Sequence, residues 1–84
     1  MKVTGTDLRV MRMHAKKTTM QMAEVAGVKT RKTYENWEKG SCTPNINQFI
    51  VMTMACGFDV VKVLRQVKQR ETEDTVLDVY KALK

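Results

Sequence analysis

Apolar residues recur every three or four positions along most of this 84-residue chain, and polar residues fill the intervals. That period is typical of amphipathic helices, in which one stripe of side chains faces a core and the others face water. Only one proline and four glycines interrupt the pattern. The sequence therefore predicts an all-α protein built from short helices.

Three helices are predicted in the first half of the chain, over residues 6–16, 18–27 and 30–40. Thr18 or Thr19 is the expected N-cap of the second and Thr30 that of the third, because a threonine hydroxyl can accept from a free backbone N–H there. Gly27 and Gly40 can adopt the left-handed conformation that ends a helix. The predicted inward-facing residues are Leu8, Met11, Ala15, Met22, Ala23, Ala26, Tyr34 and Trp37.

The second half begins with a loop and continues with three more predicted helices. Residues 40–45 contain Pro44 together with Ser, Thr and Asn, which favour turns. Helices are expected over 46–57, over 60–70 after the capping residue Asp59, and over 72–84. Their predicted inward-facing residues are Ile46, Phe49, Ile50, Thr53 and Met54, then Val60, Val63, Leu64 and Val67, and finally Val76, Tyr80 and Leu83.

The formal net charge of the chain is +6, and most of it lies in the first half. Residues 1–43 hold nine Lys or Arg against four acids, whereas residues 44–84 hold six against five. A basic surface raises the local concentration of phosphates and speeds encounter with them. We therefore expect an anionic partner that binds to the first half of the chain.

Other classes of protein find little support in the sequence. No apolar run approaches the roughly 18 residues of a membrane span, and the N-terminus lacks the apolar core of a signal peptide. Cys42 and Cys56 form no CxxC pair, and His14 has no partner in a catalytic or metal-binding motif. We expect a cytoplasmic protein with two reduced cysteines, no membrane contact, no cofactor, no metal and no enzymatic activity.

The stretch GVKTRKTYENWEKG, from Gly27 to Gly40, holds Tyr34 and Trp37 among four cationic residues. Either the two rings stack on exposed bases, or they anchor a short basic helix to a small core. Their spacing of three residues places both on one side of that helix. The residues that fall on its other side are Arg31, Lys32, Glu35, Asn36 and Lys39.

Two short helices joined at a glycine, the second of them basic, are the sequence pattern of a helix-turn-helix, whose second helix enters the major groove of DNA. Arg31 could bond a guanine and Asn36 an adenine, each through two hydrogen bonds. Basic residues elsewhere carry no such positional signal and are expected on solvated surfaces; these are Lys16, Lys17, Lys62, Lys68 and Arg70.

The chain resembles the lambda-repressor-like, Cro/XRE-type helix-turn-helix family over residues 5–64. The matching pieces, in order along the chain, are LRVMR (8–12), MAEVAGV (22–28), TYENWEKG (33–40), Pro44 and GFDVVKVL (57–64). The resemblance implies that the ring at Trp37 packs inside, which favours anchoring over base stacking. It also implies that Arg12 pairs with Glu38 and ties the first helix to the end of the third.

The chain departs from the family pattern at two places. One residue more than usual lies between Gly27 and Trp37, so KTRK either bulges the turn or extends the start of the third helix. The glutamine that often begins the family's second helix and contacts a phosphate is Thr19 here, with Gln21 two places on. The predicted DNA contacts are Thr19, Gln21, Lys29, Thr30, Arg31, Lys32, Glu35, Asn36, Lys39 and Ser41.

The expected architecture is a five-helix lambda-repressor-like helix-turn-helix domain over residues 1–70, followed by an additional C-terminal helix over 71–84. The stripe of Val76, Tyr80 and Leu83 would form a homodimer that reads a palindromic operator. The alternative is that this helix folds back on the fifth helix and covers Val63 and Val67. The expected function is a transcriptional repressor bound to double-stranded DNA, and the runner-up is an antitoxin or adaptor module whose main contact is another protein.

Overall fold

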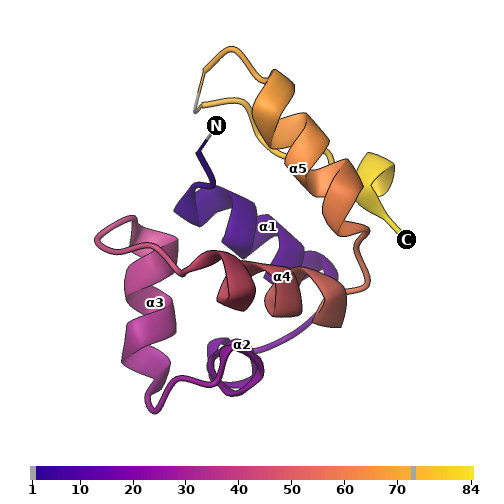
Figure 1. Ribbon diagram of the computed structural model, residues 1–84. Helices are drawn as coiled ribbons and strands as arrows, with labels where there is room; N and C mark the ends of the chain where they lie inside the picture. The colour runs from indigo at the N-terminus through magenta and orange to yellow at the C-terminus, as the bar shows by residue number, and fades with distance from the viewer. Residues whose placement is uncertain (1, 73) are drawn as a thin grey trace.

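Figure 1 shows the computed structural model of the chain, which describes residues 2–72 and 74–84. Five α-helices and one short 3-10 helix account for its regular structure, and within the described residues the extended segments form only an isolated β-bridge between Phe58 and Leu83. The predicted all-α class is confirmed. The helices are α1 (Gly5–His14), α2 (Thr19–Ala26), α3 (Arg31–Lys39), α4 (Ile46–Ala55), α5 (Val60–Gln69) and η1 (Val79–Ala82).

Local capping residues set most of the helix boundaries. Thr18 caps α2 and Thr30 caps α3, while Gly27 and Gly40 end these two helices with φ angles of 78° and 85°. These ends were predicted correctly because each depends on residues close in sequence. The first helix differs from its predicted span of 6–16, since it begins at Gly5 after the cap Thr4 and ends at His14.

The helices enclose one apolar core that contains Tyr34 and Trp37. Tyr34 is fully buried and Trp37 is 5% exposed, so the prediction that both rings anchor the third helix is confirmed. The prediction is wrong for two residues of α4, because Ile46 and Met54 are exposed while Met52 is buried in their place. Seven of the ten residues of α4 are apolar and they are spread around the helix, so periodicity alone could not tell its inner side from its outer side.

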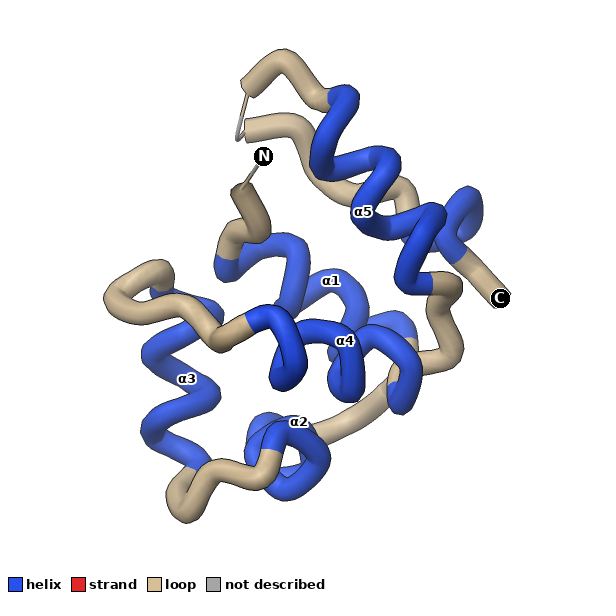
Figure 2. Tube along the Cα trace, viewed as in Figure 1, coloured by secondary structure: helices blue, strands red, loops and turns tan. Residues whose placement is uncertain are grey.

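The predicted sixth helix over residues 72–84 is wrong. The described part of this segment runs back along α5 as loop, with η1 as its only helical turn (Figure 2). The side chain of Gln66 pairs with the backbone of this segment: its Nε2 donates to the Asp78 carbonyl and its Oε1 accepts from the Asp78 N–H, both at 2.9 Å. The side chain of Asp78 then caps η1 by accepting from the N–H groups of Tyr80 and Lys81.

The residues of the predicted dimer stripe therefore do not share a helix face. Val76 and Tyr80 are 59% and 76% exposed, whereas Leu83 packs on the core and forms the bridge with Phe58. Leu77 and Ala82 are the buried residues of the segment, in the same cluster as Val63 and Val67 of α5. The segment folds back on α5, as the alternative interpretation expected, but as loop and one short 3-10 turn and not as the helix which that interpretation assumed.

A buried ion pair joins the end of α5 to the start of α1. The Arg70 guanidinium donates to both carboxylate oxygens of Asp7, at 2.9 and 2.5 Å, and also to the carbonyls of Lys2 and Thr75. The side chain of Arg70 is only 7% exposed and that of Asp7 only 1%. The expectation that Arg70 lies on a solvated surface is wrong, because its partner lies 63 residues away in the sequence.

The N-terminus of α1 touches the carboxyl end of α3 through Gly5. A Cβ atom at this position would lie 2.2 Å from the Glu38 carbonyl oxygen and 2.6 Å from that of Trp37. Backbone atoms cannot yield as a flexible side chain can. Glycine is therefore needed for this close approach of the two helices.

We predict that Gly5→Ala lowers the free energy of unfolding by roughly 3 kcal/mol, because the added methyl group overlaps the end of α3. Thr6→Ala is the matched control: Thr6 is exposed in the same turn of α1, and this change should stay within about 0.5 kcal/mol. Urea denaturation of both variants measures the difference. Equal stabilities would show that α1 and α3 can separate without cost.

Candidate nucleic-acid interface

A tight connection joins α2 to α3. Gly27 leaves the helical conformation, and the Val28 N–H donates back to the Ala23 carbonyl at 3.1 Å. Residues 28–30 then lead to the first residue of α3, Arg31, with Thr30 as its cap. Of the stretch KTRK, Lys29 and Thr30 therefore lie in the turn, and Arg31 and Lys32 form the start of α3.

Two aromatic rings hold α3 on the core. Tyr34 and Trp37 meet edge to face, with ring centroids 6.0 Å apart and planes at 74°. Such a pair stabilises beyond the apolar area that it buries. With both rings on the inner side, the outer side of α3 stays free for other contacts.

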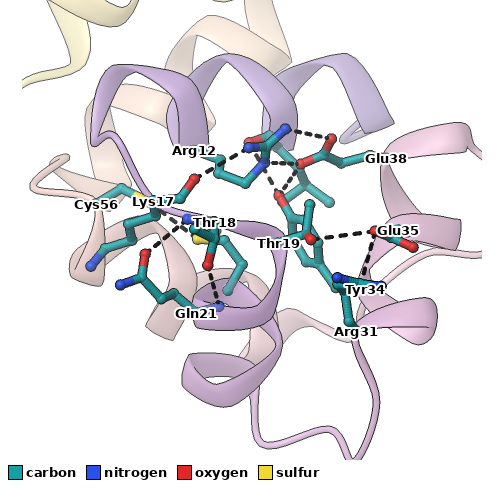
Figure 3. Close-up of polar contacts among 12 residues, drawn as sticks. Arg12, Lys17, Thr18, Thr19, Gln21, Arg31, Tyr34, Glu35, Glu38 and Cys56 are labelled. Atoms are coloured by element: carbon teal, nitrogen blue, oxygen red, sulfur yellow. Dashed lines mark hydrogen bonds and ion pairs between the residues drawn. The ribbon is translucent and has the colours of Figure 1, made fainter.

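A polar network fixes α3 against α1 (Figure 3). Arg12 donates through Nε to Glu38 Oε2 at 2.6 Å and through Nη2 to Glu38 Oε1 at 3.2 Å. The Tyr34 hydroxyl also donates to Glu38, at 2.5 Å, and Arg12 reaches the Lys17 carbonyl beyond the end of α1. The pairing of Arg12 with Glu38 that the resemblance implied is confirmed.

The electrostatics of this network favour the protonated forms of Tyr34 and Arg12. Burial, followed by the hydrogen bond to Glu38, raises the pKa of Tyr34 well above its ordinary value, so the hydroxyl keeps its proton as a donor. The hydrogen bond from Arg12 to Glu38 likewise raises the pKa of the guanidinium. All three side chains are thus held in one arrangement.

The outer side of α3 carries the residues that the sequence singled out for DNA. Arg31, Lys32 and Lys39 are exposed, while Glu35 and Asn36 are partly exposed. Arg31 Nε lies 3.5 Å from Glu35 Oε2, one helical turn away. The Thr19 hydroxyl donates to the same carboxylate oxygen at 3.3 Å, so the start of α2 lies against the outer side of α3.

The remaining predicted contacts are more scattered. Lys29 and Thr30 are exposed in the turn before α3, and Ser41 is exposed just after it. Gln21 does not join this group, because it pairs with Thr18 in the capping box of α2. In Figure 3 Gln21 lies beside Lys17, away from Arg31 and Glu35.

Sequence reasoning missed Arg9. This exposed arginine of α1 lines a shallow cleft between α1, α2 and α3, together with Arg12, Thr19, Glu35, Glu38 and Lys39. Arg9 stands three residues before Arg12, so the two share a side of α1. This spacing could have shown that Arg9 lies beside Arg12, but only the packing of α1 on α3 shows that this side of α1 lies next to the outer residues of α3.

Other kinds of site have less structural basis. Among residues 2–72 and 74–84, no three His, Cys, Asp or Glu side chains are placed to hold a metal ion. Within the same residues, none of the helices combines the length and the apolar character that a membrane crossing needs. Cys42 is exposed and Cys56 is buried, and burial raises the pKa of the Cys56 thiol.

Comparisons with protein-family models, with curated proteins and with solved structures found no match. The resemblance to the Cro/XRE-type family therefore stays a prediction from the sequence motifs.

We predict that Glu38→Gln lowers the free energy of unfolding by roughly 1–3 kcal/mol, because Arg12 loses its counter-charge in a partly buried site. Glu24→Gln, at an exposed position of α2, is the matched control and should change stability by less than about 0.5 kcal/mol. Thermal melts of both variants test this. If the two melt alike, the network does not fix α3.

Proposed function

We propose that this chain is a sequence-specific DNA-binding regulator of transcription, with α2 and α3 as a helix-turn-helix and α3 as the helix that enters the major groove. One observation supports this most strongly. A short helix is fixed on its inner side by Tyr34 and Trp37, and it presents Arg31, Lys32 and Lys39 on its outer side. A rigid helix with cations and an amide facing outward suits base reading at the groove floor.

The residues divide into two roles in this proposal. Arg31 and Asn36 read base edges, since guanidinium and carboxamide groups can each make two hydrogen bonds to one base. Lys32, Lys39 and Arg9 contact phosphates, which positions the protein without reading sequence. Glu35 orients Arg31 and, through Thr19, couples it to the start of α2.

Repression is the proposed mode of regulation, because a small domain that occupies an operator excludes other proteins from the same DNA. A single domain of this size reads few base pairs, so a palindromic site read by two copies is part of the proposal. No catalytic role is assigned to the chain. The place of action is the cytoplasm, in contact with the genome.

We predict steep salt dependence of binding. If two copies together contact six or more phosphates, affinity for duplex DNA should fall on the order of 10³-fold between 50 and 200 mM salt. Fluorescence anisotropy with a labelled random duplex measures the non-specific affinity. The same assay with a duplex selected from a random pool measures the specific affinity. A flat salt response would rule out DNA as the partner.

We predict that alanine substitutions of the base-reading residues and of the phosphate-contacting residues change DNA binding in different ways. Arg31→Ala and Asn36→Ala should each reduce the preference for the selected site over random duplex by roughly 1–3 kcal/mol, whereas Lys39→Ala should weaken binding to both alike. Lys68→Ala, an exposed lysine of α5, is the control and should change neither. Identical behaviour of Arg31→Ala, Asn36→Ala and Lys39→Ala would place base reading elsewhere.

A further inference from the structure

A carboxylate stands on the outer side of α3, among the cations proposed to meet DNA. Helix α3 contains two acids, Glu35 and Glu38. Glu38 accepts from Arg12 and Tyr34, so its charge is balanced between α3 and α1. Glu35 instead lies partly exposed beside Arg31. A negative charge at this place repels phosphates, so affinity for DNA does not account for it.

The carboxylate of Glu35 is held from two helices. Its Oε2 accepts from the hydroxyl of Thr19, the first residue of α2, at 3.3 Å (Figure 3). The same oxygen lies 3.5 Å from Nε of Arg31. The threonine hydroxyl is neutral, so it fixes the position of the carboxylate without reducing its charge. Glu35 is therefore a fixed anion placed directly beside a cation that points outward.

This contact restrains Arg31 without occupying the end of its side chain. The ion pair is closest at Nε, which leaves the two Nη groups at the tip to donate to the O6 and N7 atoms of a guanine. Phosphate oxygens compete for the same guanidinium, because arginine also pairs strongly with phosphate. An arginine that binds a phosphate reads no sequence. To reach one with its whole fork, Arg31 has to leave Glu35.

We propose that Glu35 is a specificity-determining residue, which weakens binding to random DNA more than binding to the operator. This inference rests on the proposed function. At the operator, Arg31 meets a guanine and keeps its contact with Glu35. On random DNA, Arg31 either stays with Glu35 and gains no partner, or moves to a phosphate and leaves an unpaired carboxylate close to the DNA backbone. A repulsive element of this kind widens the difference between two affinities.

The test is the variant Glu35→Gln, which removes the charge and keeps an oxygen that can accept from Thr19. Affinities for the selected site and for random duplex are measured by fluorescence anisotropy at one salt concentration. Affinity for random duplex should rise roughly fivefold, because a repulsive charge near phosphates is lost. Affinity for the selected site should change by less than about twofold, because the lost repulsion is offset by the lost restraint on Arg31.

Salt dependence gives a second readout. On random duplex, an Arg31 released from its restraint neutralises one further phosphate in each copy. The slope of log affinity against log salt concentration should therefore become steeper by about 0.9 per bound copy for Glu35→Gln. On the selected site the slope should not change, because Arg31 still contacts a base.

Two controls separate this role from a general effect of charge. Glu71→Gln makes the same change at an exposed acid just after α5, and in Figure 1 α1 and α4 lie between α5 and α3. It should leave the ratio of the two affinities unchanged. In an Arg31→Ala background, Glu35→Gln should also leave this ratio unchanged, because no guanidinium remains to be restrained. Far-UV circular dichroism checks that each variant is folded.

The outcomes distinguish this inference from the proposed function. If the wild-type chain selects a site but Glu35→Gln and Glu71→Gln give the same ratio, the role of Glu35 is refuted and DNA binding stands. The same holds if Glu35→Gln lowers the ratio equally in the Arg31→Ala background, since Glu35 then acts without Arg31. A wild-type chain that binds no duplex, or prefers none, would overturn the proposed function and the role of Glu35 with it.

Discussion

The ion pair between Arg12 and Glu38 is the interaction on which the placement of α3 depends. Both side chains are partly buried, and the carboxylate accepts from Arg12 and from Tyr34 at once. A charge in such a site is tolerated because all its partners are present together, and removing one leaves the others unsatisfied. The network therefore sets the angle of α3 more sharply than apolar packing alone would, since apolar contacts are not directional.

Features of the fold that depend on residues close in sequence could be predicted, and features that depend on residues far apart in sequence could not. Thr18, Thr30, Gly27 and Gly40 end helices through hydrogen bonds to residues three or four positions away, so the sequence pattern located them. The C-terminal segment was mispredicted because Gln66 pairs with its backbone at Asp78, which no local propensity reports. The helix predicted over residues 72–84 would be only marginally stable alone, and the contact with Gln66 holds the segment in a non-helical conformation instead.

The candidate site was predictable where helical spacing sufficed. Tyr34 and Trp37 mark the inner side of α3, and their positions alone identify its outer residues. Arg9 and the contact from Thr19 to Glu35 depend on how α1 and α2 pack around α3, which spacing within one helix does not reveal. The outer side of α4 could not be assigned either, because its seven apolar residues surround the helix and its three polar residues form no single stripe to show which side is exposed.

The guanidinium of Arg70 has a consequence for how the chain folds. It joins the end of α5 to Asp7 and Lys2 near one terminus and to Thr75 near the other, across 63 and 68 residues of sequence. Closing so long a loop costs more conformational entropy than closing a short one, so this contact persists only while the helices between its partners stay packed. Asp7 is also part of the cap of α1, so one carboxylate serves both the start of the first helix and the guanidinium at the end of α5. The two ends of the chain therefore belong to one cooperative unit, and neither can fray without exposing a buried charge at the other.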